Sequence, residues 1–375
     1  MLIQHEENLN VSQLSDEAPK EKVTVSGNIL VLCAYDIGDL IDINKIKARK
    51  LLRTSDNEPF PHFKNYHVPL SVDISDISEK EPLATVMAKI HTFGVMSLTY
   101  VIPFTETFDT LKIRLIQIVN NYKQISKRDA KAAYLQLKMV TTEPNFFNLK
   151  TSYYAVQTEN KSLNITSKNF ASQYGHVIAS LLRLETQMMS EHQIEETLQS
   201  STAYYGSDLI VIGAEGAFIY DSEYHEPLEF FELASIQKLE LQCFDKLLDR
   251  KLNHFYNSDT YNLPLKSYIP ILGSRVDSTL MDIAKLRVDI SVITERLNNS
   301  VNMTGDPYFQ KLYNMLVHVF KLREWKSSID EKLTIINEMY TVRKNRLDTV
   351  REEMLTLVII LLIAFEASVA FMNKL

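Results

Sequence analysis

The chain has 375 residues, of which 45% are hydrophobic and 23% charged, and its formal net charge is −7 at pH 7. This composition excludes a disordered chain, and the acidic balance excludes a general attraction to nucleic acid, so direct DNA binding is not expected. Two cysteines far apart in sequence, Cys33 and Cys243, exclude a disulfide framework and are expected to be buried, reduced thiols.

Residues 1–22 are polar and have neither the apolar stretch of a secretion signal nor the arginine-rich pattern of an organelle presequence. We expect them to form a flexible arm. From residue 23 the chain is rich in β-forming residues, and the run 23–37 predicts a strand. The basic segment 42–53 follows, where the spacing of apolar side chains predicts a short helix.

Two apolar runs within 83–104 meet at Gly94, which predicts a β-hairpin because glycine permits a tight turn. Residues 106–122 then carry apolar side chains at helical spacing. Thr105 or Thr107 is the expected N-cap of this helix.

A second, loosely similar round of elements begins near residue 152. It predicts a strand at 152–158, one helix through 169–199 and a hairpin in 208–221. All the elements up to this point are accounted for by one α+β domain over residues 23–228.

Beyond this domain the pattern is almost wholly helical. Residues 228–256 predict one amphipathic helix, and the apolar residues of 276–301 alternate at three and four positions, which is the heptad spacing of a coiled coil. We therefore expect a helical stalk over residues 229–350.

A helix break is predicted near residue 305. Gly305 suits the left-handed residue that ends one helix, while Asp306 suits the N-cap and Pro307 the first position of the next. So short a link predicts a helical hairpin. The helix after the break is expected over 306–325.

The last helix begins near Ser327 and contains neither glycine nor proline, so we expect it to run for about 45 residues, or about 70 Å. Residues 354–372 carry one charge and are about long enough to cross the hydrocarbon core of a bilayer. Residues 351–375 are therefore predicted to be a C-terminal transmembrane anchor. Basic residues precede this span, which predicts that the N-terminal bulk is cytoplasmic. They are Arg343, Lys344, Arg346 and Arg351.

Glu366 is the one charged residue within the predicted span. Three interpretations stay open: it lies near the far interface and is hydrated, it is protonated and hydrogen-bonded to a neighbouring span, or it belongs to an ion or proton path. Ala364 and Ser368 favour the second, because small residues at this spacing let helices approach closely.

Two other groups of residues are candidate contact surfaces. Leu333, Ile336 and Tyr340 keep a heptad-like spacing in the last helix and are expected to join copies of the stalk in a homo-oligomer. A basic run is a candidate contact for anionic lipid or RNA phosphate, although a solvated helix face is the preferred interpretation. It consists of Lys45, Lys47, Arg49, Lys50 and Arg53.

No motif of a metalloprotease, a serine hydrolase, a phosphate-binding loop or a CxxC site occurs in the chain. The histidines of the helical stretches, His176, His254 and His318, have no ligand partners at metal-binding spacing. We therefore expect no catalytic activity, no cofactor and no metal.

Several segments together resemble the required-for-meiotic-nuclear-division family. Residues 91–104 are similar to that family's Tyr-Gly-Val-Val strand, and 177–187 to its helix ending in a glutamate. Residues 305–340 lead, as in the family, into an apolar span with an internal glutamate, matched by Glu366. The resemblance implies a membrane-anchored, homo-oligomeric protein without known catalytic activity, with a ribosome or another large complex as a partner. Segment 228–256 is similar to bacterial relatives, which implies a bacterial cytoplasmic membrane.

The preferred hypothesis is a non-catalytic scaffold or tether that sits in the lipid bilayer and self-associates through its stalk and span. The alternative is a membrane-linked sensor whose α+β head binds a small ligand and signals through the long helix.

Overall fold

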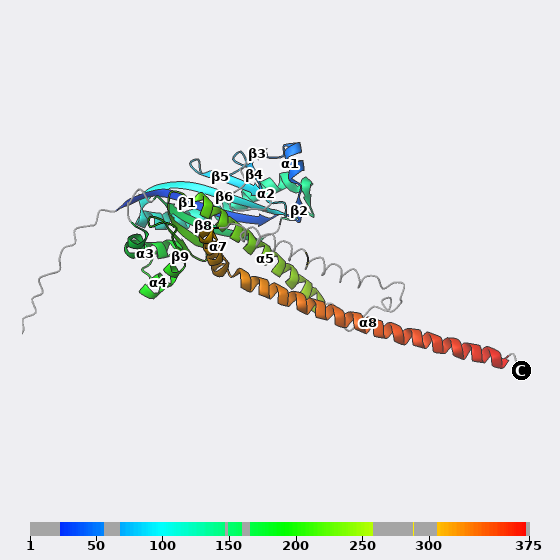
Figure 1. Cartoon of the computed structure of the whole chain (residues 1–375). Coiled ribbons are helices and arrows are strands. Elements are labelled where there is room, and N and C mark those ends of the chain that lie inside the picture. Colours follow the sequence, from blue (N-terminus) through cyan, green and yellow to red (C-terminus); the bar gives the residue numbers. More distant parts are fainter. Residues whose placement is uncertain are drawn as a thin grey trace, which may run out of the picture.

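The structure, a computed structural model, describes residues 23–55, 68–146, 149–159, 166–257, 288 and 306–372. Its centre is a nine-stranded sheet with helices on both faces, and a long helix leaves the sheet towards the C-terminus (Figure 1). The predicted α+β class is confirmed, and the arm predicted for 1–22 lies outside the described residues. Across the sheet the strands are β3 (Arg53–Thr54), β4 (Leu70–Asp73), β5 (Thr85–Ile90), β6 (Val95–Thr107), β1 (Thr24–Asp36), β8 (Lys150–Thr158), β11 (Gly216–Tyr220), β10 (Leu209–Ile212) and β9 (Ser201–Thr202).

The two longest strands, β1 and β6, pair in antiparallel register along their whole length. Along β1, Ile29 and Val31 enter one hydrophobic core, and Leu30 and Leu32 enter the other. Because both faces of the sheet are covered, the strand is a continuous apolar run rather than an alternating one.

Both predicted hairpins are confirmed. β5 and β6 are antiparallel neighbours joined by a turn at 91–94, and β10 and β11 form the second hairpin. Gly94 has a φ of 95°, and a Cβ at this position would lie 1.6 Å from the carbonyl oxygen of Gly38. A residue with a side chain therefore does not fit this turn.

One face of the sheet is covered by α2 (Phe108–Leu137) and α3 (Ser167–Arg183), with α4 (Glu191–Gln199) packed against α3. Of the two predicted candidates, Thr107 and not Thr105 is the N-cap of α2. The single helix predicted over 169–199 is wrong, because α3 ends where Leu184 takes a left-handed conformation with φ 52°. Ser190 then caps α4 by accepting a hydrogen bond from Gln193 N.

The other face is covered by α5 (His225–Asn257), α7 (Pro307–Val319) and α8 (Leu322–Met372). α5 lies between the sheet and α8, and most of its side chains from Leu228 to Leu241 are buried. The predicted boundary between residues 228 and 229 therefore falls inside a helix that belongs to the core of the head. Hydrophobic burial on a covered sheet, rather than a separate stalk, explains the apolar pattern of this helix.

The predicted start of a helix at Pro307 is confirmed, since Asp306 caps α7 by accepting a hydrogen bond from Tyr308 N at 2.8 Å. The helix end predicted at Gly305 lies outside the described residues. The next break is earlier than predicted: α7 ends at Val319, Lys321 has a φ of 56°, and α8 already begins at Leu322. The heptad-spaced segment 276–301 and its predicted hairpin lie outside the described residues, apart from Val288.

Candidate functional site

α8 is one helix of 51 residues, about 77 Å long at 1.5 Å per residue. This confirms the expectation of a single uninterrupted C-terminal helix. Residues 352–370 are exposed on every side, and an 18-residue stretch of the helix has a mean hydropathy of 2.2. Among the described residues, α8 is the one helix that is long and apolar enough to cross a membrane.

The first part of α8 packs on α5 instead of facing a partner molecule. Leu333, Ile336 and Tyr340 are 4%, 0% and 7% exposed and belong to the core between α8, α5 and the sheet. The expectation that these three side chains join copies of the stalk is therefore corrected. An apolar stripe at this spacing needs a partner surface, and here the chain's own α5 supplies it.

A polar contact fixes α8 on α5 along one edge of this packing. Lys332 Nζ lies 2.6 Å from Asp245 Oδ1 and 2.6 Å from Asp249 Oδ1. Ser328 donates a hydrogen bond to Asp245 as well. Residues one turn apart on α8 thus meet residues one turn apart on α5, and the two helices run in the same direction (Figure 1).

The exposed end of α8 presents two different faces. Ala364 and Ser368 are four residues apart and lie on one face, where Ser368 Oγ donates a hydrogen bond to the Ala364 carbonyl at 2.8 Å. Glu366 is two residues from each, or about 200° around the helix, and so points to the opposite side. Ala370 is the small residue on the Glu366 face. Ala364 and Ser368 therefore lie on a different face of the helix from Glu366, and their part in a helix contact stays a prediction.

A buried ion cluster joins the sheet to α5 and is formed by Lys89, His91, Ser97, Glu229 and Glu232. Lys89 Nζ lies 2.6 Å from Glu229 Oε1 and 2.6 Å from Glu232 Oε2. Ser97 donates its proton to the other oxygen of Glu232, and His91 Nε2 lies 3.3 Å from Ser97 Oγ. The His91 Nε2–H therefore donates to Ser97. The cluster joins β5 and β6 to α5.

Burial and charge set the protonation of the ion cluster. Burial lowers the pKa of His91 to about 4, so the imidazole is neutral at pH 7. Burial works to raise the pKa of Glu232, but Lys89, His91 and hydrogen bonds outweigh it and lower the pKa. Burial works to lower the pKa of Lys89, and the two carboxylates raise it above its usual value. Lys89 and Glu232 are thus a charged pair at neutral pH.

The ion cluster has no room for a substrate. The cavity beside it, lined by Pro69 and Leu233 among others, has a volume of about 10 Å³ and holds at most one water molecule. Ser97 directs its proton to the Glu232 carboxylate and not to the His91 imidazole. This arrangement fits a structural contact between helix and sheet.

Glu240 and Asp36 form a second pair of acidic groups that sequence reasoning missed. Glu240, on α5, is 6% exposed, and burial together with the nearby Asp36 raises its pKa. Burial raises the pKa of Asp36 as well, although Gly38 N donates a hydrogen bond to it at 3.1 Å. The sequence signal that could have indicated this pair is Glu240, a carboxylate among the apolar residues of α5. The described residues contain no group of three or more side chains that could hold a metal ion.

The basic run lies on the surface, on and just after α1 (Ile43–Arg49), and all five side chains are exposed. Lys45 pairs with its own helix cap, Asp42, at 3.1 Å, and Arg53 pairs with Asp76 at 3.1 Å. The guanidinium of Arg49 lies 3.3 Å from the sulfur of Met139, in the short 3-10 turn that follows α2. These local contacts favour a solvated face over a site for an anionic partner.

The fold and the C-terminal helix define an α+β protein that ends in a helix long and apolar enough to cross a bilayer. Residues 26–226, from β1 to the first turn of α5, match the family described as "Uncharacterized protein MJ0711, N-terminal domain". This match spans more than half of the chain, and the chain belongs to that family.

A relative, the uncharacterized protein MJ0711 of Methanocaldococcus jannaschii, is 25% identical over 181 residues, which are 48% of this chain and 54% of the relative. The chain thus covers about half the length of that relative. No solved structure matches the chain. The resemblance to the required-for-meiotic-nuclear-division family stays a prediction.

Proposed function

We propose that this protein is a single-span membrane protein that acts as a non-catalytic scaffold or tether. The observation that carries the proposal is that α8 has two different parts. Its first part is buried on α5, whereas residues 354–370, which are mostly apolar and carry Glu366 as their one charged residue, are exposed on all sides. A helix that is apolar on all sides is stable in lipid but costly to expose to water. Because one uninterrupted helix belongs to both the head and the span, the head has a fixed orientation relative to the bilayer.

The proposed orientation places the α+β head in the cytoplasm. Four basic residues lie between 343 and 351, before the apolar stretch, and Lys374 is the one that follows it. Positive charge remains preferentially on the cytoplasmic side of a span. The relative described above is archaeal, so the bacterial cytoplasmic membrane stays a prediction.

Self-association is proposed to occur through the Glu366 face of the span. A carboxyl group in hydrocarbon needs a hydrogen-bond partner, and a second copy of the same helix offers one. Ala370 lies one turn away on the same face and allows close approach. The stalk residues Leu333 and Ile336 play no part in this contact, because α5 already covers them.

Alkaline carbonate extraction of membranes that contain the full chain tests the anchorage. The wild-type chain is expected to stay in the membrane pellet at about pH 11. Replacing Ile360 and Ile363 together by arginine places two charges near the middle of the span, each costing about 2.5 to 3.5 kcal/mol, and is expected to release the chain. The matched control is Leu135→Arg, an exposed apolar residue of the head. Wild-type protein in the soluble fraction would overturn the proposal.

A further inference from the structure

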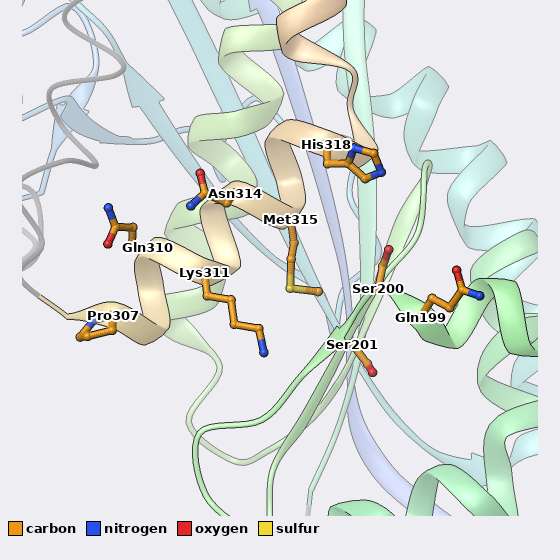
Figure 2. A pocket seen from close by; sticks show the side chains of 9 residues that line it. All are labelled: Gln199, Ser200, Ser201, Pro307, Gln310, Lys311, Asn314, Met315 and His318. Atoms are coloured by element: carbon orange, nitrogen blue, oxygen red, sulfur yellow. The ribbon is translucent and has the colours of Figure 1, made fainter.

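A cleft with a volume of about 780 Å³ opens between α7 and the segment that joins α4 to β9 (Figure 2). One wall carries Gln199, Ser200 and Ser201, and the other carries Lys311, Asn314 and His318 of α7. Figure 2 shows Lys311 and the neighbouring Met315 directed from α7 towards the opposite wall. The volume lies within the range of small-molecule sites in proteins.

The chemistry of the cleft is that of an anion site with further polar contacts. Lys311 supplies one positive charge, and hydroxyl and amide groups on both walls supply neutral hydrogen-bond donors. None of the described residues that line the cleft is an aspartate or a glutamate, although the chain as a whole has a net charge of −7. A recess without carboxylates on an acidic protein favours an anionic ligand.

The donors are arranged by the helix itself. Lys311, Asn314 and His318 lie three and four residues apart and form one stripe of α7, while Phe309 and Leu312 bury the opposite side. The packing of α7 on the sheet and α5 therefore holds the stripe in place. Tyr313 strengthens this packing by donating a hydrogen bond of 2.7 Å to Gln237 on α5.

We propose that this cleft binds a small organic anion, with Lys311 at its phosphate or carboxylate group and the polar side chains of both walls at its neutral part. α7 is joined to α8 by Phe320 and Lys321 alone, so the ligand sits beside the start of the membrane helix. Phe320 is buried against Tyr153, with ring centroids 5.0 Å apart. Such a site suits a head that senses a metabolite.

Calorimetric titration of the full chain in detergent tests the site with three probes: inorganic phosphate, adenosine monophosphate and citrate. One organic anion is expected to bind at least about tenfold more tightly than inorganic phosphate, because it also reaches the neutral donors. Lys311→Gln is expected to weaken that binding by about tenfold or more. The matched control Lys326→Gln, an exposed cation of α8 outside the cleft, should bind as the wild type does.

Three results would overturn the inference. They are no binding of any probe at millimolar concentration, equal affinity for phosphate and the organic anions, or affinity unchanged by Lys311→Gln. Circular dichroism of the variant shows whether it is folded, and Ser201→Ala offers a second, milder change in the opposite wall. The inference does not depend on the membrane proposal, which carbonate extraction tests separately.

Discussion

Lys89 Nζ and Glu232 Oε2 lie 2.6 Å apart in a buried ion pair, although the two residues are 143 positions apart in the chain. The lysine belongs to β5 and the glutamate to α5, the helix against which α8 packs. The pair therefore fixes the sheet, α5 and, through α5, the long C-terminal helix relative to one another.

Replacing Lys89 by methionine is expected to destabilise the head strongly. The change removes the cation and leaves Glu229 and Glu232 facing each other in a buried setting, which costs about 3 to 5 kcal/mol of unfolding free energy. Urea unfolding of the full chain in detergent measures this loss of unfolding free energy. The triple variant with Glu229→Gln and Glu232→Gln should recover part of the loss, and Lys131→Met, an exposed cation of α2, is the control. A Lys89 variant as stable as the control would show that the cluster contributes little.

His91 is expected to make stability depend on pH between about 6.5 and 4. The folded state holds this imidazole neutral, with a pKa of about 4, while the unfolded chain takes up a proton near pH 6.5. As the pH falls through this window the unfolded state gains more protons, so stability falls, by about 3 kcal/mol in total.

The measurement compares unfolding free energies of the wild type and His91→Gln at pH 7 and pH 4.5. The pKa of Glu229 is raised in the folded state, so this group makes the protein more stable as the pH falls. Both proteins contain Glu229, and the difference between their pH profiles therefore reports on His91. The variant should lose less stability on acidification than the wild type. Parallel pH profiles would contradict the assignment.

The neighbouring residues Ile335 and Ile336 offer a matched test of how α8 packs. Ile336 is fully buried against α5, whereas Ile335 is 37% exposed. Ile336→Ala is expected to lower the unfolding free energy by about 2 to 5 kcal/mol, and Ile335→Ala by about 0.5 kcal/mol or less. The oligomeric state, measured by light scattering in detergent, should be the same for both. A change of oligomeric state in Ile336→Ala alone would restore the stalk as the contact between copies.

Cysteine crosslinking in native membranes distinguishes the two faces of the span. If copies meet through the Glu366 face, Ala370→Cys forms a disulfide-linked dimer upon mild oxidation and Ser368→Cys does not, because the two positions lie about 200° apart around the helix. The native thiols Cys33 and Cys243 are buried and give little background. Crosslinking at position 368 alone would assign the contact to the small-residue face, and none at either position would exclude self-association here.

Much of the fold could be predicted because its signals are local. Thr107 as an N-cap, Asp306 before Pro307 and the glycine turn at Gly94 each act through a few adjacent residues. The ends of α3 and α7 were not predicted correctly, because their sequence lacks such a local signal. Leu184 and Lys321 both adopt left-handed conformations that are usual for glycine, so their sequence carries no sign of the break.

The sequence by itself determined that the chain ends in a long helix with an apolar final part, because composition and spacing along one segment are sufficient for that. Tertiary structure alone decided which surface covers each apolar face. The spacing of Leu333 and Ile336 is equally consistent with a contact between copies and with a contact inside one chain. Only the position of α5 shows that both side chains belong to the core. The Lys89 pair and the cleft at Lys311 were hidden for the same reason: hydrogen bonds and charge pairs depend on distances in space, which residues far apart in the chain acquire only upon folding.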